Sequence, residues 1–175
     1  MTFASAVAGW INEIVKNTNM SFGVAEVENT TPGSPQRSDV VIFSSPTSRN
    51  VLCVIEFKQP YEDVLSGSLL DQAFFRYAKK YEAAYFCTCN GKTLAWFDTN
   101  EVIQTGGMNI TRGLLSRFDL AAIVSFDRIS AKDEFDIKSG LREFLKSLHE
   151  RHYNRKLTPP KRDQRIFSDP ASKRY

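Results

Sequence analysis

The hydrophobic positions of the chain switch between helical and strand spacing, and this alone predicts an order of elements. Apolar residues recur every three to four positions, as in amphipathic helices, in 3–17, 68–83 and 131–153. Short apolar runs of strand character occupy 22–29, 39–44, 51–57, 83–89 and 93–98. The predicted order is a helix, three strands, a helix, two strands and a helix. We therefore expect an α/β or α+β domain with a mixed sheet.

Turn residues separate several of these elements. The content of Pro, Gly and Ser makes 30–38 a loop. Asn90-Gly91 predicts a type I′ hairpin turn, because both residues tolerate positive φ angles. The pattern of 101–116 predicts no element.

The third predicted helix, over 131–153, is expected to be the last element of the folded domain. Ser130 and Asp133 have the spacing of a capping box at its start. Beyond it, the chain is polar, basic and poor in core residues, as in a linker or a disordered end. Because 175 residues suffice for one well-packed domain, we expect a folded domain over 1–156 and a basic tail over 157–175.

The net charge of +3 is unevenly distributed. Residues 151–175 hold eight basic and two acidic side chains, which leaves 15 basic and 18 acidic side chains before them. The basic character therefore belongs to the tail. No apolar run approaches the roughly 18 residues of a membrane span, and no secretory signal opens the chain, so a cytoplasmic protein without membrane contact is expected.

The three cysteines, Cys53, Cys87 and Cys89, lie inside apolar runs, as reduced core thiols do in cytoplasmic proteins. A zinc site is the alternative, because Cys87 and Cys89 with His149 and His152 would complete a tetrahedral shell. Their spacing matches no familiar zinc finger. Core packing is therefore the preferred interpretation.

Charged residues stand where the strands of the first predicted hairpin end. Asp39 begins one strand, and Glu56 and Lys58 end the next. In an antiparallel hairpin, the residue numbers of the two partners in each pair add up to the same value. A turn near Thr47 and Ser48 makes this value about 95. Asp39 then pairs with Glu56, and Lys58 shares the face of Glu56 because strand side chains alternate. The three charges are expected to converge.

This convergence predicts a metal site. Two carboxylates in close contact repel each other unless a cation compensates them. Mg²⁺, with Mn²⁺ as a substitute, suits such a site because it takes one or two carboxylates and accepts phosphate oxygens. Lys58 would position water or stabilise charge on a phosphate, which predicts metal-dependent phosphodiester hydrolysis. The simpler alternative is a surface ion pair worth under about 1 kcal/mol.

The sequence resembles the PD-(D/E)xK nuclease superfamily in the stretches RSDVVIF, VIEFK, DQAFFRYAKKYEAAYFCTCNG and TLAWFD. The closest likeness is to the nuclease domain at the N-terminus of type I restriction-enzyme R subunits and of related single-chain restriction–modification enzymes. It covers roughly residues 10–100. The resemblance implies a restriction-endonuclease-like fold, with helices on both sides of a central mixed sheet, and a magnesium-dependent DNA endonuclease.

The resemblance also implies roles for single residues. Asp39 and Glu56 would be metal ligands, Lys58 the catalytic lysine, and Gln72 a further catalytic or DNA-contacting residue. Ser38 stands where the family usually has proline, a residue that shapes the chain and does not bind metal.

A further acidic residue often lies on the first helix in this superfamily, and Glu13 is its best match here. Glu26 and Glu28, on the first predicted strand, are alternatives. Tyr77 lies five residues after Gln72 where the family more often has four. Its phase on a regular helix favours the core.

The second predicted helix places Gln72, Arg76 and Lys79 on one polar face. These side chains suit DNA phosphates, and a solvated helix face is an equal alternative. No P-loop signature is present, so motor, methyltransferase or specificity functions are expected from further domains or subunits. The alternative function is a non-catalytic nucleic-acid-binding or assembly module with the same fold.

Overall fold

The computed structural model describes residues 2–29, 38–78, 81–106 and 109–154, without the side chains of Asn29, Ser38, Asp39, Leu69, Phe75, Arg76 and Tyr77. The predicted tail and most of the predicted 30–38 loop lie outside this part. The chain divides into two compact units, Met1–Phe144 and Leu145–Tyr175. In the described part, no helix has the length and apolar character needed to cross a membrane.

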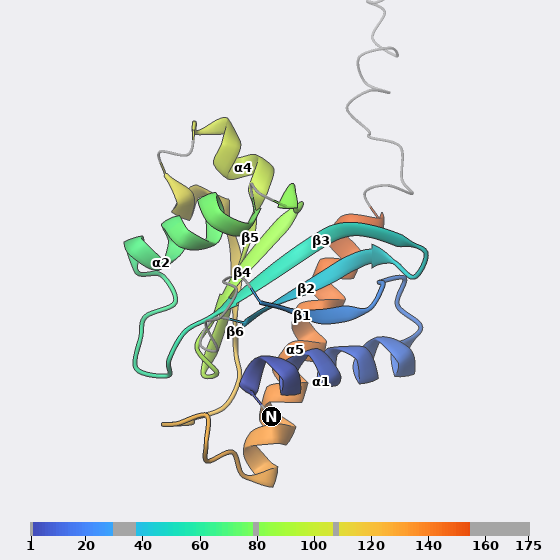
Figure 1. Ribbon diagram of the computed structural model, residues 1–175, viewed down its shortest axis with the longest axis vertical. Helices are drawn as coiled ribbons and strands as arrows, with labels where there is room; N and C mark the ends of the chain where they lie inside the picture. Colours follow the sequence, from blue (N-terminus) through green and yellow to red (C-terminus); the bar gives the residue numbers. More distant parts are fainter. Residues whose placement is uncertain (1, 30–37, 79–80, 107–108, 155–175) are drawn as a thin grey trace, which may run out of the picture. The chain divides into compact units, whose positions relative to one another are not determined.

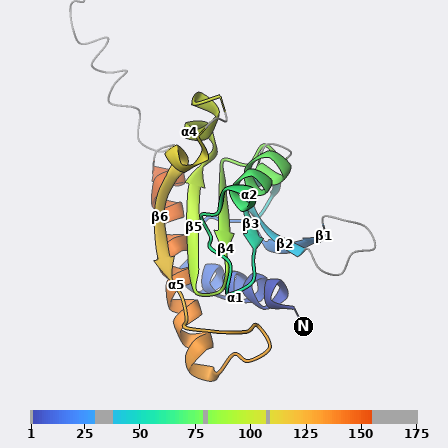
Figure 2. The ribbon, with the colours of Figure 1, turned by 90° about the vertical axis from the view of Figure 1, so that its left-hand side faces the viewer.

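A six-stranded mixed sheet lies in the first unit (Figure 1), and Figure 2 shows the strands in the order β6 to β1 across the view. The strands are β1 (Ala25–Asn29), β2 (Ser38–Ser45), β3 (Ser48–Phe57), β4 (Tyr85–Cys89), β5 (Thr93–Asp98) and β6 (Leu114–Asp119). β3 and β4 are parallel, and the other neighbours are antiparallel. The predicted mixed sheet is confirmed. The predicted number of strands is wrong, because β6 is a partly exposed edge strand with a weak hydrophobic signal.

The helices are α1 (Phe3–Thr18), α2 (Gly67–Asp71), α4 (Thr99–Gln104) and α5 (Ala131–His149), with a 3₁₀ turn η2 (Ile110–Gly113) and π-helical segments η1 (Gln72–Ala78) and η3 (Glu150–Asn154). The helices predicted over 3–17 and 131–153 are confirmed, the last with a π-helical end. Ser130 and Asp133 form the predicted capping box, with both backbone-to-side-chain bonds at 3.0 Å. The helix predicted over 68–83 is regular only to Asp71 and then widens into η1.

The helices cover both faces of the sheet. On one face, Phe3 of α1 meets Phe57 of β3, with ring centroids 5.6 Å apart. Phe144 of α5 meets Trp96 of β5 on that same face, at 5.8 Å. The η1 segment covers the opposite face, where Phe74 meets Phe86 of β4. Because strand side chains alternate, Glu56 lies on the η1 face, opposite to Phe57.

The β2–β3 hairpin changes register along its length. Its turn is Pro46-Thr47, between the paired residues Ser45 and Ser48. Two register shifts follow, between Ile42 and Phe43 and between Phe43 and Ser45. The predicted turn position is therefore one residue too late. Beyond the shifts, Val40 pairs with Ile55, which restores the predicted pairing.

The β4–β5 turn differs from the expected type I′ geometry. Gly91 has a φ of 86°, whereas Asn90 has no positive φ. The Asn90 side chain instead accepts the backbone N–H groups of Lys92 and Thr93, both at 2.9 Å. Asn90 thus shapes this turn with its amide oxygen, which keeps its amide nitrogen available for another segment.

Candidate active site

The sheet brings three acidic positions side by side. Val40 pairs with Ile55, and the same register continued by one residue places Asp39 beside Glu56. On the other side of β2, Glu28 pairs directly with Asp39. The side chain of Asp39 lies outside the described part. Positions 28, 39 and 56 therefore form one row across β1, β2 and β3.

Glu56 and Lys58 form a buried ion pair. Their residues are 3% and 8% exposed, and Lys58 Nζ lies 3.3 Å from Glu56 Oε1. The alternative of a surface ion pair is therefore wrong. Burying two charges costs several kcal/mol per ion, which pairing repays only with good geometry and further hydrogen bonds. A stabilising role alone accounts poorly for this pair.

Gln72 is the second partner of the lysine. Lys58 Nζ donates a hydrogen bond of 3.2 Å to Gln72 Oε1. Gln72 is the first residue of the π-helical segment, and such segments are frequent at functional sites. The structure thus brings Glu56, Lys58 and Gln72 together. Strand alternation predicts that Glu56 and Lys58 share a face, and Gln72 is a candidate through the family resemblance. The side chain of Arg76 and the whole of Lys79 lie outside the described part.

The backbone fixes Lys58 at the carboxyl ends of the parallel pair β3 and β4. Its N–H donates to the carbonyl of Cys89 at 2.8 Å, which extends the pairing beyond Phe57. Thr88, which pairs with Glu56, donates from Oγ1 to the carbonyl of Val64 at 2.8 Å. The chain after Lys58 is therefore attached to β4.

Asn90 makes a second attachment to the same segment. Its amide nitrogen donates to the carbonyl of Glu62 at 2.8 Å. The segment also closes on itself, because Gln59 N–H donates to Glu62 Oε2 and Glu62 N–H donates to the carbonyl of Gln59. Neither Thr88 nor Asn90 is among the residues that the sequence pattern indicates for the site. The Asn90-Gly91 pair predicts a turn, and nothing in its sequence indicates the bond to Glu62.

The three candidates for an additional acidic residue have different surroundings. Glu13 Oε2 lies 3.4 Å from Lys138 Nζ, and its side chain is 54% exposed. Glu26 binds Arg49 through both carboxylate oxygens, at 2.8 and 3.3 Å, and this hydrogen bonding lowers the pKa of Glu26. Glu28 pairs with Asp39 in the sheet. Among the three candidates, Glu28 is therefore the one that lies in the row of positions 28, 39 and 56.

Carboxylates in this row fit a hard divalent cation such as Mg²⁺, which prefers oxygen ligands. Among the described side chains, no group of three or more His, Cys, Asp or Glu could hold a metal ion. The Asp39 carboxylate is not among these described side chains.

The cysteines are core thiols, as expected. Cys53, Cys87 and Cys89 are at most 1% exposed, and Cys53 Sγ lies 3.5 Å from Cys87 Sγ. Burial raises the pKa of Cys89 to about 12, and burial also raises the pKa of Cys87. The Cys87 and Cys89 thiols therefore stay protonated at neutral pH, and a protonated thiol is unreactive.

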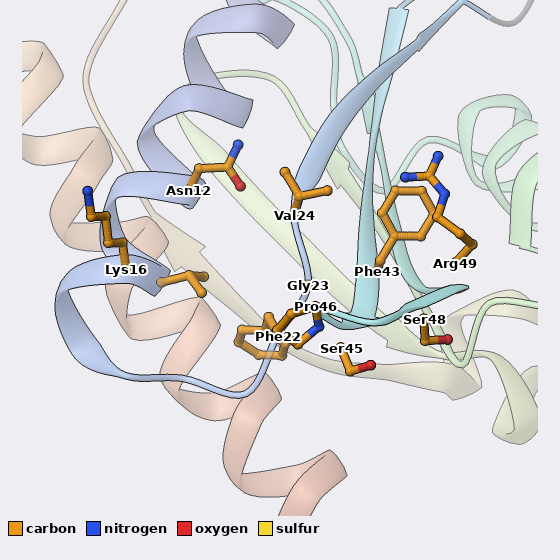
Figure 3. Close-up of a pocket in the computed structure, with 11 residues that line it drawn as sticks. Asn12, Lys16, Phe22, Gly23, Val24, Phe43, Ser45, Pro46, Ser48 and Arg49 are labelled. Carbon is orange, nitrogen blue, oxygen red and sulfur yellow. The ribbon is translucent and has the colours of Figure 1, made fainter.

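A separate pocket of about 480 Å³ lies at the other end of the β2–β3 hairpin (Figure 3). Asn12 and Lys16 of α1 border it, and the hairpin contributes Phe43 and Arg49. The Arg49 guanidinium lies over the Phe43 ring, 4.0 Å from its centroid, as Figure 3 shows. Neither Glu28 nor Glu56 lines this pocket.

One comparison with solved structures decides the fold. The chain is similar to the crystal structure of the type IIG restriction endonuclease BpuSI, with a TM-score of 0.60 and 16% sequence identity. The chain has a restriction-endonuclease-like fold. The match covers 86% of this chain and 17% of the BpuSI chain, so the chain spans a small part of that enzyme's length. No family model and no curated protein matches the sequence.

The restriction-endonuclease-like fold confirms the predicted fold class. In this fold the Glu56, Lys58 and Gln72 cluster lies on one face of a mixed sheet with helices on both sides. The structural likeness is to a type IIG enzyme. It supports the restriction-endonuclease-like fold, and it does not test the more specific resemblance to type I R subunits.

Proposed function

We propose that the chain is a metal-dependent DNA endonuclease domain of a restriction–modification system. The observation that carries this proposal is the buried contact of Lys58 with Glu56 and Gln72, in register with Asp39. The likeness of the fold to a restriction endonuclease supports it. The alternative of a non-catalytic module is less favoured, because a module that does not cut need not keep both charges of a buried ion pair, which is costly to form.

Asp39 and Glu56 would hold Mg²⁺ or Mn²⁺, with Glu28 as a neighbouring carboxylate. The bound ion would supply positive charge to the phosphate and lower the pKa of a water molecule. Lys58 carries three N–H donors, and Gln72 accepts one of them. A remaining N–H can therefore donate to a phosphate oxygen and stabilise the charge that develops there.

DNA is the proposed substrate, and target recognition, methylation or translocation would come from further domains or subunits. Arg76 and Lys79 remain proposed phosphate contacts beside Gln72. The small share of BpuSI that the chain matches is consistent with a nuclease part of a larger protein.

Cleavage of supercoiled plasmid in Mg²⁺ or Mn²⁺ tests the proposal, with calorimetric titration of the metal alongside. Asp39→Ala should lose both cleavage and the metal-binding heat, and Lys58→Ala should lose cleavage only. Melting temperatures near that of the unmodified chain would show that the variants fold. Cleavage by Asp39→Ala at the unmodified rate, or metal heat unaffected by its mutation, would contradict the proposal.

A further inference from the structure

An exposed tyrosine lies three residues after the candidate catalytic lysine. Tyr61 is 83% exposed, although Lys58 is 8% exposed and nearby Val64 is 3% exposed. The other large apolar side chains with more than 60% exposure in the described part are Val124 and Phe135. Tyr61 alone among these three belongs to the segment that follows β3.

The backbone on both sides of Tyr61 is held in place. Gln59 and Glu62 close the turn with reciprocal bonds of 2.8 and 2.9 Å. Asn90 binds the Glu62 carbonyl, and Thr88 binds the Val64 carbonyl, both at 2.8 Å. The tyrosine therefore belongs to a segment that is anchored to β4, and one of the anchors, Thr88, is the residue that pairs with Glu56.

The acidic residues next to Tyr61 are engaged by the turn itself. Glu62 Oε2 accepts the N–H of Gln59, and Asp63 Oδ1 accepts the N–H of Leu65.

Ordering an aromatic side chain such as that of Tyr61 costs little conformational entropy, because it has only two χ angles. Every nucleobase offers a π-face, so an aromatic ring can bind nucleic acid without reading its sequence.

We propose that Tyr61 binds DNA next to the cleaved phosphate by stacking its ring on a nucleobase. This inference rests on the proposed nuclease function and adds a binding residue to it. Tyr61 would increase affinity for the strand beside the lysine, and its hydroxyl group would not be needed. Stacking of this kind predicts a loss of affinity of about 5-fold or more on truncation to alanine.

The test measures binding of a fluorescent oligonucleotide, single-stranded and duplex, with Ca²⁺ in place of Mg²⁺ to prevent cleavage. Tyr61→Ala should weaken binding, whereas Tyr61→Phe and Tyr61→Trp should retain it. Phe135→Ala is the matched control, because it removes a ring that is 69% exposed on α5. A 2-aminopurine base inside the oligonucleotide should lose fluorescence with the unmodified chain and not with Tyr61→Ala.

The outcomes separate this inference from the proposed function. Unchanged binding by Tyr61→Ala, while Asp39→Ala abolishes cleavage, would overturn the role of Tyr61 and leave the nuclease in place. Equal losses in Tyr61→Phe and Tyr61→Ala would overturn stacking. No DNA binding and no cleavage by the unmodified chain would overturn both. Melting temperatures of all variants exclude unfolding as the cause.

Discussion

Lys58 contacts both Glu56 and Gln72 in the candidate site. It lies within 3.3 Å of Glu56 Oε1 and donates to Gln72 Oε1, and it is almost completely buried. An ammonium group on a flexible stem needs such partners to occupy one position. At the scale of single residues, Gln72 is therefore expected to act by positioning Lys58.

Replacing Gln72 by alanine should lower cleavage by up to about 100-fold, the order of loss expected when a catalytic group is misplaced. The metal-binding heat should change little, because Asp39 and Glu56 remain. Gln104→Ala is the matched control, since that side chain is exposed at the end of α4. Single-turnover rates and metal titrations of both variants measure the effect, and a normal rate for Gln72→Ala would contradict it.

The row of positions 28, 39 and 56 leads to a prediction about Glu28. Glu28→Gln should reduce metal affinity by about 10-fold or more, as loss of a site's supporting carboxylates does. Glu26→Gln should not, because Glu26 is bound to Arg49 at the surface. Calorimetric titration with Mn²⁺ compares the two variants with Glu13→Gln. A loss confined to Glu13→Gln would show that the helix glutamate is the additional ligand.

At the scale of elements, the hairpin and the second helix differ most from what their sequences predict. The Asp39 and Glu56 positions are aligned although the turn is at Pro46-Thr47, because two register shifts compensate for it. The second predicted helix becomes π-helical from Gln72, where the backbone bonds run from i to i+5. The side chain of Tyr77 lies outside the described part, so its place in the core stays a prediction.

The capping box of α5 gives an element-scale prediction. Ser130→Ala removes the side-chain acceptor of the Asp133 N–H, which should reduce the free energy of unfolding by about 1 kcal/mol. Ser130→Asp retains an acceptor and should be close to the unmodified chain. Urea denaturation measures both variants. Equal stability of Ser130→Ala and the unmodified chain would show that α5 does not depend on this cap.

At the scale of the whole molecule, the sheet core limits stability at high pH. The buried thiol of Cys89 has a pKa raised from 9.0 to about 12 by burial, so the unfolded chain loses its proton first. The native state then binds more protons than the unfolded state, and the free energy of unfolding falls as pH rises. The fall is expected between about pH 9 and pH 12.

Cys89→Ala should make this alkaline loss of stability less steep, by up to about 1.4 kcal/mol per pH unit for one thiol. Burial also raises the pKa of Cys87, so part of the slope should remain. Urea denaturation at a series of pH values from 7 to 11 measures the slope. An identical slope in Cys89→Ala would mean that other groups control stability in this range.

Much of the sheet is predicted by the sequence alone, because strand alternation and helical period depend on local spacing. The same spacing makes Asp39, Glu56 and Lys58 candidate site residues, and the family resemblance adds Gln72 as a candidate. Spacing shows which face of an element is buried, but not which other element covers it. The bond between Lys58 and Gln72 was therefore not part of that prediction.

Only the tertiary structure brought in the residues that surround the site. Thr88 and Asn90 reach the segment after Lys58 across 24 and 28 residues of sequence, through hydrogen bonds that no local pattern signals. Likewise, the pairing of β1 with β2 distinguishes Glu28 from Glu13 and Glu26 by position. Such contacts are decided by sheet order and register, which depend on how the whole core packs.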